Sequence, residues 1–188
     1  MYTWHFTFDD QPAVRDLAAA YQARLEGLPG LDLVPARWLH LTIQDVGFTD
    51  EVGDEDLAAI VAAARRRLAS LSPEQVRLGP ARVTSEGILL DVEPAAGLMA
   101  IRTELRAAIS EVWSAAKVLG PAEWTPHVGI AYSSTSAPGA PCVTALAKSG
   151  ATAESVIQSV QLIILGRDQH MYEWETYTSI QLTRGGAA

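Results

Sequence analysis

Residues 38–46 of the chain read WLHLTIQDV, a stretch in which apolar and polar side chains alternate. Successive side chains of a β-strand point to opposite faces, so this alternation predicts a strand with one buried face. The polar face carries His40, Thr42 and Gln44 in one row. A histidine beside a hydroxyl on such a face is a candidate for acid–base chemistry near neutral pH.

A second histidine has similar surroundings at residues 125–130, which read TPHVGI. His40 and His127 lie 87 residues apart, nearly half of the 188-residue chain, as in a duplicated fold whose halves each supply one copy of a strand. The tripeptide H-x-[ST] alone is weak evidence, because four histidines would give roughly half a match by chance. Strand context and spacing carry more weight. Two interpretations follow: a catalytic pair, or two structural histidines at a sheet edge.

The remaining periodicities predict an α+β protein built from two strand–helix–strand halves. Strands are expected at residues 2–8, 38–46, 76–83, 88–92, 127–132, 156–165 and 172–182. Helices are expected at residues 12–28, 54–71, 94–119 and 143–148. In the first strand Thr3, His5 and Thr7 form a polar phase that is expected to face water. Three arginines at 65–67 form either a solvated helix end or a phosphate-binding patch.

The composition is that of an ordinary globular protein, with 48% apolar and 19% charged residues. We expect residues 1–188 to form a single bilobal domain. The chain has 14 Lys and Arg against 22 Asp and Glu, a net charge of -8, which disfavours binding to duplex DNA. A small phosphate-bearing ligand in a cleft is compatible with this charge, because a few well-aimed donors suffice there.

Neither the cysteine content nor the N-terminal sequence indicates secretion. Cys142 has no partner for an intrachain disulfide, and we interpret it as a small core or loop residue rather than a nucleophile. The sequence MYTWHFTFDD lacks the basic and apolar regions of a signal peptide, and no later stretch approaches about 18 apolar residues. We expect a cytoplasmic monomer that does not enter a membrane.

The stretches WLHLTIQDVG (38–47) and PHVGIAY (126–132) resemble the two signature strands of the two-histidine (2H) phosphoesterase superfamily, in particular its 2'-5' RNA ligase-like and cyclic phosphodiesterase members. The resemblance covers the element order of nearly the whole chain. It implies two antiparallel sheets related by a pseudo-twofold axis, with helices outside and a central cleft. It also implies hydrolysis of a small nucleotide or RNA-end phosphodiester, often 2',3'-cyclic, without a metal or other cofactor.

The resemblance assigns catalysis to His40 and His127. Thr42 completes the first H-x-[ST] motif, whereas Gly129 stands where the second motif has Ser or Thr. Tyr132 stands where many ligase-type relatives carry an arginine. The residue types suit the reaction, since imidazoles with a pKa of about 6.5 can take a proton from water and give one to a leaving ribose oxygen. A threonine hydroxyl can donate to a non-bridging phosphate oxygen.

Further residues are candidates for substrate contact. His5 and Gln44 lie on polar strand faces that could line the same cleft, and Trp38 could stack on a base. The competing interpretation of these three residues is edge polarity or packing. Hydroxyls at residues 133–135 could replace the one that Gly129 lacks, or the hydroxyl is simply lost.

Other functions stay open at the level of sequence. A zinc hydrolase would use several histidines, but compact spacing such as H-E-x-x-H is missing. A binding protein without turnover is favoured by Gly129. RNA end joining would need a focused basic patch, such as Arg37, Arg82 and Arg167, on this acidic chain. His170 offers a further cation for phosphate, or is simply an exposed turn residue.

Overall fold

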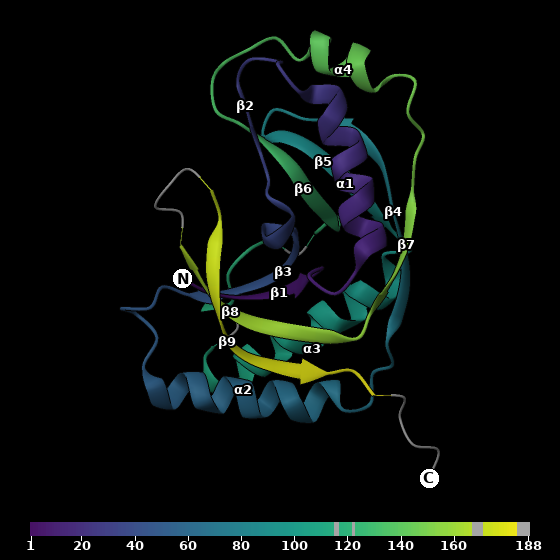
Figure 1. Cartoon of the computed structure of the whole chain (residues 1–188). Helices are drawn as coiled ribbons and strands as arrows, with labels where there is room; N and C mark the ends of the chain where they lie inside the picture. Colours follow the sequence, from purple (N-terminus) through teal and green to yellow (C-terminus); the bar gives the residue numbers. More distant parts are fainter. Residues whose placement is uncertain (115–116, 122, 167–170, 184–188) are drawn as a thin grey trace.

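The structure, a computed structural model, describes residues 1–114, 117–121, 123–166 and 171–183 (Figure 1). The strands are β1 (Tyr2–Thr7), β2 (Leu31–Leu33), β3 (His40–Gly47), β4 (Glu74–Val83), β5 (Gly87–Glu93), β6 (His127–Ser133), β7 (Ala153–Ile157), β8 (Ser159–Gly166) and β9 (Glu173–Gln181). The helices are α1 (Pro12–Leu25), α2 (Asp54–Leu68), α3 (Ala96–Val112) and α4 (Ala140–Leu146). A 3-10 turn, Ala36–Trp38, precedes β3.

The strands form two sheets, one below the other in Figure 1. The first sheet has the order β3-β1-β8-β9, and the second has the order β2-β6-β5-β4-β7. Every pairing is antiparallel. The expected α+β class with two antiparallel sheets is therefore confirmed. Strands β3 and β6, which carry the two histidines, contact each other where the sheets meet.

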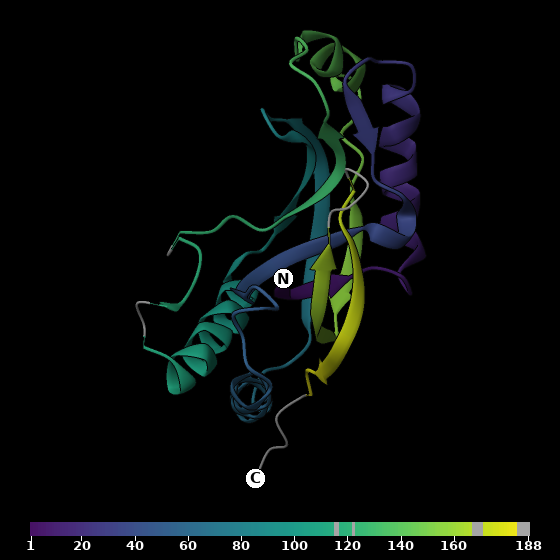
Figure 2. The same ribbon diagram turned by 90° about the vertical axis from the view of Figure 1, so that its left-hand side faces the viewer.

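The helices cover the outer sides of the two sheets. α2 packs along α3, and α3 packs against β3, whereas α1 contacts β6 and β7 and α4 contacts β4. Figure 2 shows the two helix pairs at opposite ends of the molecule. α1 begins at Pro12, whose fixed φ suits a first helical turn, and its apolar stripe is buried. No helix in the described ranges is long and apolar enough to cross a membrane.

Two of the three arginines at 65–67 join the first helix pair. Arg66 and Arg67 of α2 contact Glu111 of α3 at 2.7 and 2.6 Å, and Arg67 also contacts Glu104 at 2.8 Å. Arg65 instead donates to Oγ1 of Thr178 in β9 at 2.7 Å. None of the three lines the cleft described below, so the structure does not support the phosphate-patch interpretation.

Three expectations from the sequence are wrong in detail. The helix expected to reach residue 119 ends at Val112, where Trp113 leaves the helix and donates its indole N–H to Asp56 of α2 at 2.8 Å. The strand expected at 156–165 is divided into β7 and β8. Thr3 and His5 do not face water but are fully buried, and the rings of His40 and Trp174 pack on His5.

Candidate active site

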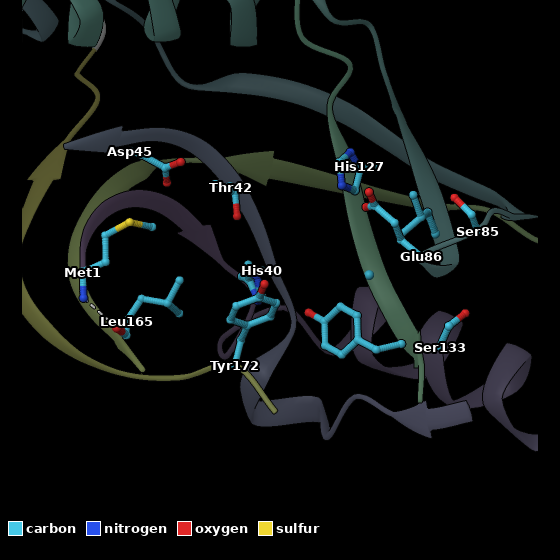
Figure 3. Close-up of a pocket in the computed structure, with 13 residues that line it drawn as sticks. Met1, His40, Thr42, Asp45, Ser85, Glu86, His127, Ser133, Leu165 and Tyr172 are labelled. Carbon is cyan, nitrogen blue, oxygen red and sulfur yellow. Dashed lines mark hydrogen bonds between the residues drawn. The ribbon is translucent and has the colours of Figure 1, made fainter. Parts of the chain in front are cut away.

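Strands β3 and β6 bring His40 and His127 to one cleft of about 590 Å³ (Figure 3). His40 is 8% exposed, and His127 is more accessible. The cleft is lined by Met1, His40, Thr42, Asp45, Ser85, Glu86, Leu89, His127, Gly129, Tyr132, Ser133, Leu165 and Tyr172. Two histidines that are distant in sequence therefore share one polar cavity.

A β-bulge follows the histidine in each strand. Ile43 is skipped in the pairing of β3 with β1, and Ile130 is skipped in the pairing of β6 with β5. One extra residue reverses the alternation of faces, so the third cleft residue of each strand comes five positions after the histidine. The carbonyl of Ile43 accepts a hydrogen bond from Arg102 Nε at 3.0 Å. The two rows in the cleft are His40-Thr42-Asp45 and His127-Gly129-Tyr132.

Both imidazoles are held by the same kind of contact. Nδ1 of His40 lies 2.8 Å from the carbonyl oxygen of Trp38, and Nδ1 of His127 lies 2.9 Å from that of Thr125. A carbonyl oxygen only accepts, so Nδ1 carries the proton and donates in each ring. In the neutral ring Nε2 is then the free acceptor. The shared bond to the residue two positions earlier also agrees with a duplicated strand.

Aromatic rings surround His40. The His5 ring stacks on it with centroids 4.5 Å apart, and Tyr172 and Trp174 present their rings edge-on at 6.1 and 5.1 Å. Burial lowers the pKa of His40, the charge of His127 lowers it further, and the hydrogen bond to the backbone acts in the opposite direction. His40 is therefore neutral at neutral pH and able to accept a proton.

His5 lies behind the cleft, contrary to the expected substrate contact. It is fully buried, and its Nε2 lies 3.1 Å from Oγ1 of Thr42. Its Nδ1 has no hydrogen-bond partner among the described residues, which fits a ring that is protonated on Nε2 and donates to Thr42. Burial, together with nearby His40, lowers the pKa of His5 well below its usual value. His5 therefore positions Thr42, which lines the cleft as expected.

Gln44 does not line the cleft either. The bulge at Ile43 turns its side chain to the opposite face, where it is 2% exposed. Its amide nitrogen donates to the carbonyls of Asp45 and Leu119 at 2.8 and 2.7 Å, and its amide oxygen accepts from Arg106 at 2.9 Å. Asp45 takes the place in the cleft, and burial raises the pKa of this carboxyl.

Trp38 is also outside the cleft lining, so the structure does not bring its ring to the place where stacking on a base was expected. It ends the 3-10 turn instead of opening the strand, and its ring packs 4.7 Å from that of Trp174. The guanidinium of Arg37 lies over the indole of Trp38, 5.0 Å from the ring centroid. The contribution of Trp38 to the site is its backbone carbonyl, which fixes the ring of His40.

Gly129 and Tyr132 line the cleft, and so does Ser133 of the following loop. The sequence interpretation missed Tyr172, whose ring meets both His40 and Tyr132 edge-on (Figure 3). It also missed Glu86, which was assigned only to the turn between β4 and β5. No feature of that turn in the sequence points to the cleft.

The charge of the cleft is unusual for a phosphate site. Among the described residues that line it, the acidic side chains are Asp45 and Glu86, and none is Lys or Arg. Glu86 and His127 are both among the residues that line the cleft (Figure 3). His170 and Arg167, considered from the sequence as cations for phosphate, lie outside the described residues. In the part of the chain that the structure describes, no group of three or more His, Cys, Asp or Glu side chains is arranged to hold a metal ion.

A family model described as the 2'-5' RNA ligase superfamily matches residues 8–169, a range that includes both histidine strands. No curated protein sequence matches the chain. The match therefore rests on the family pattern and not on one particular relative.

Solved structures share the architecture. TT0787 of Thermus thermophilus superposes with a TM-score of 0.76 at 20% identity, covering 98% of each chain. The apo form of E. coli LigT gives 0.70 at 16% identity, covering 97% of this chain and 96% of that one, and LigT has also been solved with 3'-AMP and with ATP. The MHV ns2 PDE domain gives 0.60 at 12% identity, covering 88% and 98%. At these identities the likeness shows the fold.

Proposed function

The chain belongs to the 2'-5' RNA ligase superfamily, and from this premise we propose that it hydrolyses a small nucleotide-like phosphodiester, with a 2',3'-cyclic phosphate as the favoured substrate. His40 and His127 act as base and acid, and no metal takes part. One observation carries this proposal: two imidazoles reach one cleft from separate strands, each with Nδ1 tied to a carbonyl and Nε2 left for a reacting group.

The reaction needs one group to take a proton from water and another to protonate the leaving oxygen. His40 takes the first role, since burial lowers its pKa and keeps it neutral. Its Nε2 accepts the proton as the water oxygen forms a bond to phosphorus. The bond from phosphorus to one ribose oxygen breaks, and that oxygen receives the proton from Nε2 of His127. The product is a nucleoside monophosphate.

Thr42 stabilises the charge on the phosphoryl group. Because His5 donates to Oγ1 of Thr42, the hydroxyl hydrogen of Thr42 is directed elsewhere, and Oγ1 lines the cleft. A hydroxyl donor aimed at a non-bridging oxygen acts where charge is concentrated during displacement. LigT has been solved with 3'-AMP and with ATP bound, which fits the size class of substrate proposed for this chain.

The decisive experiment is hydrolysis of the four nucleoside 2',3'-cyclic monophosphates in EDTA. Wild type is compared with His40→Ala and His127→Ala, and with His40→Asn, whose amide can keep the bond to the Trp38 carbonyl while removing Nε2. We expect turnover in wild type and its loss in all three variants, with circular dichroism and Tm showing that the fold is kept. Turnover that survives both alanine variants would overturn the two-histidine mechanism.

A second candidate is a nucleotide-binding protein without turnover, which the missing hydroxyl at Gly129 favours. Binding of 3'-AMP by folded wild type, together with no hydrolysis of any of the four cyclic nucleotides, would support it. RNA end joining by the same cleft is less well supported, because the described lining residues include two carboxylates and no Lys or Arg.

A further inference from the structure

The second histidine motif lacks the side-chain hydroxyl that the first motif has two positions after its histidine. Thr42 follows His40 by two positions, and Gly129 follows His127 by the same interval. We propose that the phenol of Tyr132 supplies the missing hydroxyl and donates to the phosphoryl group from the side of His127. This inference rests on the proposed function and assigns Tyr132 as a catalytic residue of that reaction.

The backbone of β6 places Tyr132 in this position. Without the bulge at Ile130, strict alternation would put Ala131 on the face of His127 and turn Tyr132 away from it. The extra residue reverses this order, and Tyr132 lines the cleft. The equivalent position on β3 holds Asp45, so Tyr132 provides a hydroxyl at a point where the other strand has a carboxyl.

The phenol occupies the space that a serine or threonine at 129 would need. A Cβ built on Gly129 would lie 3.1 Å from Cε1, 3.5 Å from Cζ and 3.4 Å from the hydroxyl oxygen of Tyr132. A contact of 3.1 Å is tighter than ordinary packing, so a side chain at 129 would push this ring away from its present position by a few tenths of an ångström. The hydroxyl of Tyr132 thus lies one short contact from the start of the absent side chain.

The backbone of Tyr132 is fixed on both sides, and its ring packs against a second tyrosine. The backbone pairs with Asp32 of β2 on one side and with Gly87 of β5 on the other. Gly87 has φ +146°, and a Cβ there would lie 2.9 Å from Cα of Tyr132, so this close approach requires glycine. The ring of Tyr172 meets the ring of Tyr132 edge-on at 5.4 Å and also meets His40 at 6.1 Å. A donor held in this way needs little reorganisation during the reaction.

The chemistry of a phenol suits the role. A phenol hydroxyl donates a hydrogen bond to an anionic oxygen. It carries no positive charge, unlike the arginine that the resemblance places at this position. Tyr132 therefore recognises phosphate by hydrogen bonding in a cleft whose described lining residues offer no Lys or Arg.

Tyr132→Phe removes only the hydroxyl, and Tyr177→Phe is the matched control, because it removes the same group from an exposed tyrosine that does not line the cleft. We expect Tyr132→Phe to lower kcat on the best 2',3'-cyclic nucleotide by about 10²-fold, as for the loss of one oxyanion donor, and Tyr177→Phe to change it little. A Tyr132→Phe variant with wild-type kcat would overturn the proposal.

A second comparison tests whether a serine side chain at position 129 can take the place of the Tyr132 hydroxyl. In the Tyr132→Ala background, adding Gly129→Ser restores the hydroxyl of the family motif without crowding. We expect this double variant to exceed Tyr132→Ala in kcat by about tenfold or more, and Gly129→Ser alone to fall below wild type because of the crowded ring. Equal kcat values for Tyr132→Ala and the double variant would argue against a shared role.

A binding measurement separates this inference from the proposed function. Calorimetry with 3'-AMP and with adenosine is carried out on wild type and Tyr132→Phe. We expect the substitution to weaken binding of 3'-AMP about tenfold, one hydrogen bond to a charged group, and to leave adenosine unchanged. If wild type turns over no cyclic nucleotide but this selective loss is seen, the proposed function fails and the role of Tyr132 stands. Equal binding of 3'-AMP by both proteins, or none by wild type, refutes that role.

Discussion

The ring of His5 lies flat against the ring of His40, with centroids 4.5 Å apart and planes within 4° of parallel. His5 is fully buried and His40 nearly so. Two imidazolium ions could not share this place, since each would lose its hydration and repel the other. The stack therefore excludes a charge on both rings at once, and burial favours the neutral form of each. It links the stability of the fold to the protonation state of the proposed base, His40.

Protein stability should fall below about pH 6.5, because the pKa values of His5 and His40 are lowered in the fold. Below this pH the unfolded chain binds protons that the folded chain does not, so the free energy of unfolding decreases by up to ~1.4 kcal/mol per pH unit for each histidine. Urea unfolding between pH 5 and 7.5 measures this slope. His5→Asn should show a shallower slope than wild type, and parallel profiles would contradict the assignment.

Turnover should persist to a lower pH than a base with the ordinary pKa of histidine would allow. We expect the acidic limb of kcat/KM to have its midpoint below about 6.5, because burial and the charge of His127 lower the pKa of His40. NMR titration of the His40 ring checks the cause. In His127→Asn the pKa of His40 should rise, and an unchanged value would remove the coupling between the two rings.

Loss of the Thr42 hydroxyl should slow the reaction without disrupting the cleft. Thr42→Val keeps the shape of the side chain and should lower kcat by about 10²-fold, while Thr42→Ser should stay close to wild type. The valine also leaves Nε2 of His5 without its partner, at a cost of about 1–3 kcal/mol in stability. Steady-state kinetics and urea unfolding separate the two effects. Equal kcat values for valine and serine would exclude a catalytic hydroxyl.

Gln44 should matter for stability and not for substrate binding. Gln44→Leu removes its bonds to the carbonyl of Leu119 and to Arg106, and we expect a loss of about 2–3 kcal/mol in the free energy of unfolding. KM should stay within about twofold of wild type, because the side chain points away from the cleft. A large rise in KM with unchanged stability would instead place Gln44 in contact with substrate.

Alternation in the sequence was sufficient to find the two histidine strands and the residue two positions after each histidine. It failed for Gln44, because neither Ile43 nor its neighbours carry a glycine or another mark of a bulge. A bulge depends on pairing with the partner strand, which periodicity does not record. Asp45 was therefore missed as a cleft residue, and Tyr132 was expected there only through the family resemblance.

His5 and Trp38 show a different limit of the sequence. A row of alternating polar residues identifies one face of a strand, but whether that face meets water depends on what packs against it. For His5 the cover is the stacked ring of His40 together with Trp174, whose own strand lies more than 160 residues away in the chain. Trp38 was assigned to the strand, whereas Pro35 precedes a 3-10 turn that contains it.

The path of the chain bears on how this molecule can move. The connections β1–β2, β2–β3, β3–β4 and β7–β8 all pass from one sheet to the other. Closure about a hinge bends only a few residues, and here every one of these connections would have to bend together. Four connections therefore restrain the rotation of one sheet relative to the other. We expect the width of the cleft to change little when a ligand binds, so that ligands are selected by their length and shape.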